Sequence, residues 1–253
     1  MIRACAFDLG NTLVDDTALY DQTLQETAKL FEERRAISSS DRFVEVFDRI
    51  NRTTEMPFIS HTFGESQFFR DTFDELGVTS LTADEALRIY REIVISRTSL
   101  LPAIRDGVAW LGAQGIQRAI LSNERSARVE GWFSATGARE LFEFVSVSEG
   151  VGVEKPDERF FKAALERIGL PAEEVIMFGD NTIADGACQN LGIRFVHVTA
   201  YLTQRWYFES GDVHRPDYIL SEITPAALQR CLSDLEPGQS FDEVSGGASY
   251  GNT

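Results

Sequence analysis

The chain has 253 residues, of which 43% are apolar and 25% charged, and its formal net charge is −16. This length can bury a sizeable core, and the composition is ordinary for a folded globular protein. The acidic excess argues against a general nucleic-acid surface or an anionic-membrane surface, because both require clustered Lys and Arg. A small phosphorylated ligand is not excluded, since a bound metal ion and one lysine can reverse the charge locally.

The cysteines and the N-terminal residues indicate the compartment. Cys5, Cys188 and Cys231 are odd in number and widely spaced in apolar stretches, which favours buried free thiols over a disulfide framework. The opening residues lack the basic start and apolar core of a secretion signal. No apolar run approaches the ~20 residues of a membrane span. We therefore expect a soluble protein in the reducing cytoplasm.

Short apolar runs recur along the chain and end at polar residues. They cover residues 2–7, 117–121, 142–147, 175–178 and 193–198, with a candidate edge strand at 218–220. Continuous apolar runs of this length are typical of buried parallel strands. Helical patterns lie between them, as at residues 158–168. The alternation predicts an α/β fold, with a Rossmann-like parallel sheet core and helices on both faces.

One long stretch, from about Asp16 to Leu100, interrupts this alternation with four helical patterns and no convincing strand. One pattern ends at Gly77, a natural C-terminal stop, and the last opens with the reciprocal capping pair Thr82 and Glu85. Helices that only packed on the sheet would not need so long an insertion in one place. We therefore predict an inserted all-helical cap subdomain. The predicted division is a core of residues 1–15 and 101–237, a cap of residues 16–100, and a flexible Gly- and Ser-rich tail of residues 238–253.

Four short motifs follow predicted strands in a fixed order. They are FDLGNTL at residues 7–13, LSN at 121–123, EKP at 154–156 and FGDNTIADG at 178–186. Each motif alone is a weak signal, but all four in order are a strong one. In parallel sheets ligands bind at the carboxyl ends of the strands. We therefore expect Asp8, Ser122 and Asp180 to meet at one edge of the sheet.

Together with the helical insert, the four motifs resemble the haloacid dehalogenase superfamily, specifically its phosphatase-like members with a cap inserted after the first motif. The resemblance covers nearly the whole chain except the tail. It implies a Mg²⁺-dependent hydrolase of a small phosphorylated metabolite, with an aspartyl-phosphate intermediate on Asp8.

The carboxylates suit a metal-assisted attack on phosphorus. Asp8 is ionised at neutral pH and needs no base to activate it as a nucleophile. Mg²⁺ prefers one or two carboxylates together with water and phosphate oxygens, which suits Asp8 and Asp180. The resemblance adds the backbone carbonyl of Gly10 as a metal ligand, and Asp185 as a direct or water-bridged one.

The remaining motif residues fit the phosphoryl group. Ser122 can donate to a phosphoryl oxygen, and Lys155 can balance the charge on Asp8 and on the transferring group. We assign Asp8, Ser122 and Lys155 as catalytic, and Ser122, Asn123, Lys155 and Thr12 as phosphate-binding. Taken singly, these residues also have ordinary interpretations as helix caps, turn residues and a solvated lysine. Their joint occurrence in order favours function.

Gly10 departs from the family pattern. Phosphatases of this family usually carry a second Asp two residues after the nucleophile, as general acid and then base. Glycine cannot transfer a proton, and general acid–base catalysis typically contributes ~10²–10⁴ in rate. Asp15 or Asp16 could substitute, although surface or hinge roles are favoured.

Alternative functions remain open. The chain could be a catalytically degenerate member that binds a phosphorylated ligand or a partner protein. It could also be a different hydrolase of the same fold: a metal-free 2-haloacid dehalogenase, against which Asp180 counts, or a phosphonate hydrolase with a cap lysine. The only lysine in the insert is Lys29, for which a solvated face is favoured. Solvated or packed roles are also favoured for His61 and Arg70, and residues 59–64 are the expected substrate-facing loop.

Overall fold

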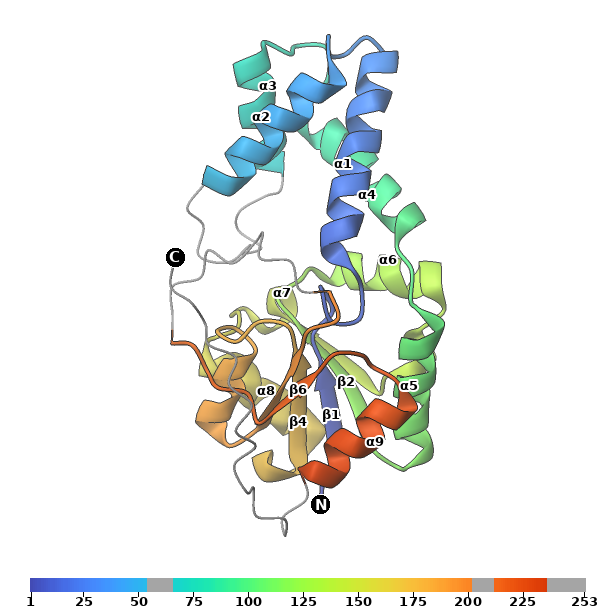
Figure 1. Ribbon diagram of the computed structural model, residues 1–253. Helices are drawn as coiled ribbons and strands as arrows, with labels where there is room; N and C mark the ends of the chain where they lie inside the picture. Colours follow the sequence, from blue (N-terminus) through green and yellow to red (C-terminus); the bar gives the residue numbers. More distant parts are fainter. Residues whose placement is uncertain (54–65, 202–211, 236–253) are drawn as a thin grey trace, which may run out of the picture.

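The computed structural model describes residues 1–53, 66–201 and 212–235. Within these ranges, six strands form one sheet in the order β3-β2-β1-β4-β5-β6, and every neighbouring pair is parallel (Figure 1). The strands are β1 Ala4–Phe7, β2 Gln117–Ser122, β3 Phe144–Val147, β4 Val175–Gly179, β5 Arg194–Val198 and β6 Tyr218–Leu220. The predicted Rossmann-like α/β sheet is confirmed.

Helices cover both faces of the sheet, because successive side chains of a strand point to opposite sides. Cys5 and Phe7 of β1 lie in one hydrophobic cluster with α5, α6 and α9, whereas Ala4 and Ala6 lie in a second cluster with α8. The helices and short 3₁₀ turns of this part are α5 Pro102–Ala113, α6 Ser126–Thr136, η1 Arg139–Leu141, α7 Ser148–Val151, α8 Glu158–Ile168, η2 Ala172–Glu174, η3 Gly186–Leu191 and α9 Pro225–Asp234.

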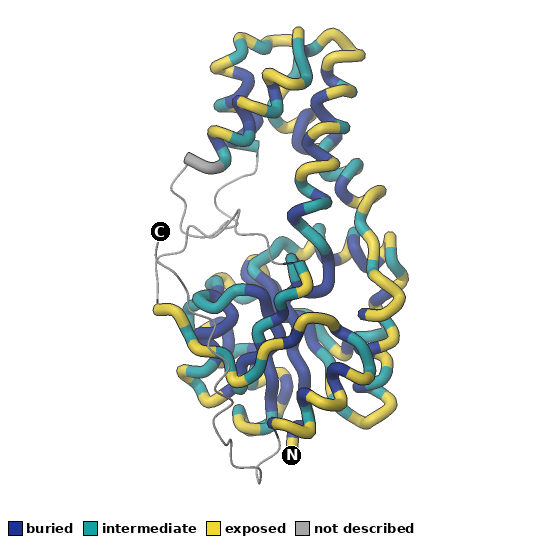
Figure 2. The backbone as a smooth tube through the Cα atoms, viewed as in Figure 1, coloured by how far each residue is buried: buried dark blue, intermediate teal, exposed yellow. Residues whose placement is uncertain are grey.

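A subdomain whose described residues form helices and no strand is inserted between β1 and α5, on the side of the sheet where the strands end (Figure 1). Its helices are α1 Asp16–Glu33, α2 Ser40–Thr53, α3 Ser66–Leu76 and α4 Ala83–Arg97. They enclose a separate aromatic core, in which Phe43 contacts Phe31, Phe47 and Phe69. The buried inner sides and exposed outer sides of these helices follow the amphipathic pattern in the sequence (Figure 2). The predicted helical insert is confirmed.

The ends of two insert helices follow local signals. Thr82 and Glu85 exchange the two hydrogen bonds of a capping box, with distances of 3.3 Å from the Glu85 amide to the Thr82 hydroxyl and 3.1 Å in the reverse direction. Gly77, directly after α3, has a φ of 67°, which suits glycine at the end of a helix.

The predicted strands at residues 2–7 and 142–147 begin two residues before β1 and β3 do. The predicted strands at 117–121 and 175–178 end one residue before β2 and β4 do. Ile2 and Phe142 are buried apolar residues that lie just before the strands begin. Ser122 and Gly179 extend their strands because each is still in register with a neighbouring strand. Apolar character marks burial, whereas the strand is defined by pairing.

Two further expectations from the sequence concern membrane-spanning helices and the state of the cysteines. None of the helices in the described ranges is long and apolar enough to cross a membrane. Cys5, Cys188 and Cys231 are buried free thiols, as predicted. Burial raises the pKa of Cys231 to about 12 and also raises the pKa of the other two thiols, so all three stay protonated at neutral pH. His61, residues 59–64 and the tail 238–253 lie outside the described residues.

Candidate active site

The candidate site lies at the carboxyl edge of the three central strands. Asp8 directly follows β1, Ser122 is the last residue of β2, and Asp180 directly follows β4. Since β1 is flanked by β2 and β4, the fold brings these three residues to neighbouring positions. All three are buried, so the site is largely shielded from solvent by the residues around it.

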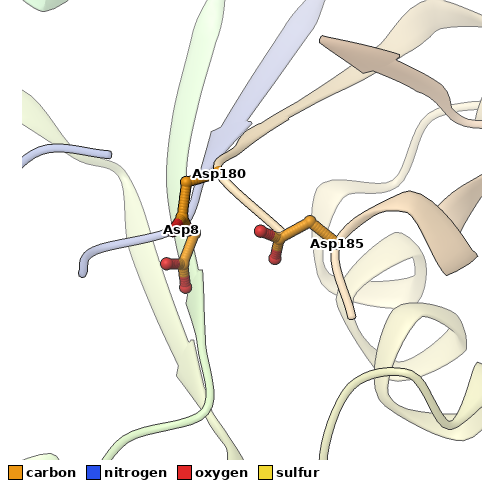
Figure 3. A group of neighbouring side chains, drawn as sticks. All are labelled: Asp8, Asp180 and Asp185. Carbon is orange, nitrogen blue, oxygen red and sulfur yellow. The ribbon is translucent and has the colours of Figure 1, made fainter. Parts of the chain in front are cut away.

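Three carboxylates converge at this edge. Asp8, Asp180 and Asp185 each offer an oxygen, and these atoms lie within 4.8 Å of one another. Figure 3 shows the carboxylate of Asp185 turned toward the other two. Three buried carboxylates at this spacing repel one another unless a cation lies between them. Oxygen ligands of this kind suit Mg²⁺, so these residues could hold a divalent metal ion.

Lys155 supplies a positive charge inside this acidic group. Its Nζ donates to Oδ1 of Asp8 at 2.8 Å, to Oδ1 of Asp185 at 2.5 Å and to the carbonyl of Leu121 at 2.9 Å. The lysine is only 2% exposed, which excludes a solvated loop lysine. Burial alone would lower the pKa of Lys155, but Asp185 and Asp8 outweigh burial and hold that pKa above its usual range. The ammonium group is therefore charged, and it partly neutralises the site.

Asp185 is held by two donors at once. One oxygen accepts from Lys155, and the other accepts from the backbone amide of Asn181 at 3.1 Å. Burial raises the pKa of Asp185, and the contact with Lys155 opposes that rise. The sequence assigned Asp185 to the metal, with capping or ion pairing as the alternative, but it did not indicate Lys155 as the partner.

Asn123 forms a reciprocal pair with the backbone of Lys155. Its amide nitrogen donates to the Lys155 carbonyl and its amide oxygen accepts from the Lys155 N–H, both at 2.8 Å. This pair fixes the loop that carries the lysine. The side-chain NH₂ has a second hydrogen that could reach a phosphoryl oxygen, so the phosphate-binding role stays a prediction.

The other predicted site residues lie in the turn after β1. Thr12 is fully buried, and its hydroxyl has no hydrogen-bond partner among the described residues. An unsatisfied buried hydroxyl costs about 1–3 kcal/mol, and a bound anion would satisfy it. Gly10 lies two residues beyond Asp8 in the same turn. The roles of Thr12, of Ser122 and of the Gly10 carbonyl stay predictions.

Two residues that were not assigned to the site support its backbone. Asn11, with a φ of 50°, accepts from both the amide and the hydroxyl of Thr17 at 3.2 Å, which ties the first motif to α1. His197 places Nε2 2.9 Å from the carbonyl of Asp180. Burial lowers the pKa of His197, so the ring is neutral and Nε2 donates this hydrogen bond. His197 lies in β5 in register with Gly179, the residue before Asp180. Its place in a predicted strand is the signal that could have indicated a position near the site.

Asp16, the first residue of α1, reaches back over the same turn. Its Oδ1 accepts from Nη2 of Arg128 at 2.6 Å, and Nε of Arg128 lies 3.1 Å from Oε1 of Glu124. Burial raises the pKa of Asp16, while Arg128 acts against that rise. Asp15 has a different task, since its carboxylate caps α1 by accepting from the amide of Ala18 at 3.0 Å.

Two family models match the chain. The model described as haloacid dehalogenase-like hydrolase covers residues 2–187, and a second, HAD-hydrolase-like model covers residues 153–226. The first match spans most of the chain and contains all four motifs. The chain belongs to the haloacid dehalogenase-like (HAD) hydrolase family. The resemblance recognised from the motifs is thereby confirmed.

Individual HAD relatives align over nearly the full length. A phosphoglycolate phosphatase from Pectobacterium atrosepticum is 25% identical over 244 residues, which are 93% of this chain and 97% of that protein. Among solved structures, the HAD hydrolase YfnB from Bacillus subtilis, bound to magnesium, superposes with a TM-score of 0.67 at 20% identity, covering 92% of this chain and 99% of that one. An L-2-haloacid dehalogenase from Xanthobacter autotrophicus gives 0.64 at 19% identity, with the same two coverages. These two structural similarities establish the shared fold.

The insert residues that could distinguish other HAD chemistries lie on the surface. Lys29 is exposed on α1, as the solvated interpretation predicted. Arg70 is exposed on α3 and donates to the side chain of Gln67 at 2.9 Å. A lysine that forms an imine has to be desolvated so that it loses its proton near neutral pH. The exposure of Lys29 therefore argues against a phosphonate-cleaving HAD site.

Proposed function

We propose that this HAD hydrolase is a Mg²⁺-dependent phosphatase of a small phosphorylated metabolite, with an aspartyl-phosphate intermediate on Asp8. The observation that supports this proposal most is the buried group of Asp8, Asp180 and Asp185 around the ammonium of Lys155. Three carboxylates and one lysine leave a net negative charge, which calls for a divalent cation before an anionic ester can bind. A phosphatase among the relatives agrees with this assignment.

Each residue of the site has its own role in the proposed reaction. Asp8 attacks phosphorus, because its carboxylate lies at the strand end beside the ammonium of Lys155. Ser122 binds the phosphoryl oxygens, with Thr12 and Asn123 as further donors, and Lys155 balances the charge on Asp8 and on the transferring phosphoryl group. Asp8, Asp180, Asp185 and the carbonyl of Gly10 would hold Mg²⁺. A bound Mg²⁺ would neutralise the phosphoryl charge and orient the ester.

We further propose that residues 16–100 act as a cap on a core of residues 1–15 and 101–237. The separate aromatic core of α1–α4 supports a distinct unit. Its position beside the carboxyl ends of the strands would exclude water from the reacting centre. The expected partner is the small phosphorylated molecule itself, with neither nucleic acid nor membrane involved, in the cytoplasm.

A panel of phosphate esters, assayed with purified protein and Mg²⁺, tests the proposal. Release of inorganic phosphate is the expected result, and 2-chloropropionate should release no chloride under the same conditions. Chloride release without metal would replace the phosphatase assignment with a dehalogenase.

One observation favours a second candidate, a degenerate protein that binds a phosphorylated ligand without turnover. Gly10 stands where the family pattern has an acid, so a proton donor is missing from that position. The binder should take up inorganic phosphate with Mg²⁺ in calorimetry and release no phosphate from any ester of the panel. Turnover of any ester excludes it.

A further inference from the structure

The space beside Gly10 is filled by the carboxylate of Asp16. A Cβ built on Gly10 would lie 2.6 Å from Oδ2 of Asp16, 3.4 Å from its Cγ and 3.9 Å from its Cβ. A side chain at position 10 would therefore collide with the Asp16 carboxylate as it now lies. The two positions are six residues apart in sequence but share one volume in the fold.

The carboxylate of Asp16 is held in this orientation from two sides. Arg128 binds Oδ1 and is itself held by Glu124, so the other oxygen, Oδ2, is left on the side of Gly10. Asn11 accepts from the backbone of Thr17 and fixes the start of α1, which carries Asp16. The side chain of Asp16 is 24% exposed, so water or a leaving group can reach it.

We propose that Asp16 is the general acid–base of this enzyme and supplies the carboxylate that Gly10 lacks. The inference rests on the proposed phosphatase function. The geometry assigns the role to Asp16 and not to Asp15, because the Asp15 carboxylate is directed at the backbone of α1.

The proton transfers balance over the two half-reactions. As Asp8 forms a bond to phosphorus, the bond between phosphorus and the ester oxygen breaks, and that oxygen takes the proton of the Asp16 carboxyl. In the second half, Asp16 as carboxylate takes a proton from water. The water oxygen then bonds to phosphorus while the bond from phosphorus to Asp8 breaks. Ester and water become alcohol and phosphate, and both aspartates return to their starting state.

A structural role for Asp16 predicts a different result. The Asp16–Arg128 ion pair joins α1 of the insert to α6 of the core, so it could serve only to hold the two parts together. In that case a variant would lose stability, or would lose activity equally on every ester. A proton donor instead matters most for esters whose leaving group is a strong base.

The first experiment compares Asp16→Asn with Asp15→Asn on phenyl phosphate and 4-nitrophenyl phosphate. Asparagine keeps the size of the side chain and an acceptor for Arg128. We expect kcat/KM of Asp16→Asn to fall about 10²–10³-fold on phenyl phosphate and several-fold less on 4-nitrophenyl phosphate, whose leaving group needs little protonation. Acid-quenched Asp16→Asn should also retain phosphoenzyme, because water activation is lost. Asp15→Asn should match the wild type.

The second experiment moves the carboxylate back to position 10. Asp16→Ala should lose activity as Asp16→Asn does, and it also removes the atoms that a side chain at Gly10 would meet. The double variant Gly10→Asp/Asp16→Ala should have a kcat/KM on phenyl phosphate about tenfold higher, or more, than that of Asp16→Ala. Gly10→Asp alone should not gain activity, because its Cβ would meet the Asp16 carboxylate.

Three outcomes would overturn the inference. They are wild-type kcat/KM in Asp16→Asn, an equal loss on both esters without phosphoenzyme, and no recovery in a folded double variant. A wild-type protein that releases no phosphate and forms no phosphoenzyme would instead overturn the proposed function, and the role of Asp16 with it.

Discussion

The ammonium nitrogen of Lys155 lies 2.8 Å from Oδ1 of Asp8, although the two residues are 147 positions apart in the sequence. The same nitrogen also donates to Asp185 and to the carbonyl of Leu121. One buried cation therefore joins the third motif to each of the other three. The stability of the core and the geometry of the candidate site depend on the same side chain.

Replacing this lysine should destabilise the protein strongly. Lys155→Met leaves the buried carboxylates of Asp8 and Asp185 without their cation, which should lower the free energy of unfolding by about 3–5 kcal/mol. Lys162→Met is the matched control, since Lys162 is 56% exposed and pairs with Glu158 one helical turn away. Such surface pairs contribute about 0.3–0.5 kcal/mol. Urea unfolding measures both losses, and equal losses would contradict the buried network.

Asp8→Asn should remove turnover without unfolding the protein. The amide cannot attack phosphorus, so kcat should fall by about 10⁴-fold or more, and no acid-stable or hydroxylamine-sensitive phosphoenzyme should form. Asp157→Asn is the control, because asparagine caps α8 as well as aspartate does and Asp157 lies outside the site. Phosphate release and mass spectrometry of quenched enzyme provide the readouts. Turnover near the wild-type rate in Asp8→Asn would place the nucleophile elsewhere.

Mg²⁺ should stabilise the folded protein even without substrate, because it relieves the repulsion among Asp8, Asp180 and Asp185. At about 100 times its Kd, Mg²⁺ contributes about 2.7 kcal/mol. That stabilisation corresponds to a rise in Tm of about 5–10 °C for a chain of this size. Thermal melts with Mg²⁺ and with excess chelator measure the difference.

Asp180→Asn provides the comparison for the metal. The variant should lose most of the Mg²⁺-dependent rise in Tm and should not be stabilised further by high Mg²⁺. A wild-type Tm that is identical in Mg²⁺ and in chelator would remove the metal from the site.

Gly179→Ala should disrupt the site through contact with Asp185. A Cβ on Gly179 would lie 2.1 Å from Oδ2 of Asp185 and 2.3 Å from its Cγ, so the carboxylate has to move away from Lys155. We expect a loss of phosphate release of about 10²-fold and a smaller rise in Tm with Mg²⁺. Gly150→Ala is the control, since its Cβ would meet nothing closer than 3.9 Å. If both variants kept wild-type activity, the placement of Asp185 would not matter for function.

The sequence predicted the parts of the site that depend on strand order. Asp8, Ser122 and Asp180 each lie at the end of a predicted strand, and parallel strands bring such ends to one edge. It did not predict contacts that depend on how loops pack. The pairing of Asn123 with the Lys155 backbone, for example, joins two turns through space. Asp16 was assigned mainly to a surface or hinge role, because its proximity to Gly10 arises only when α1 folds back over the turn.

The small side chains of β1 affect how far the lysine must reach. Ala4 and Ala6 face α8, and their methyl groups let Phe160 and Phe161 approach the sheet closely. The loop that carries Lys155 leads directly into α8, so the distance from that loop to β1 depends on the thickness of this layer. A larger residue at Ala6 would push the helix outward and draw the ammonium away from Asp8. Core alanines with no polar atom in their side chains thus help to set the geometry of the candidate site.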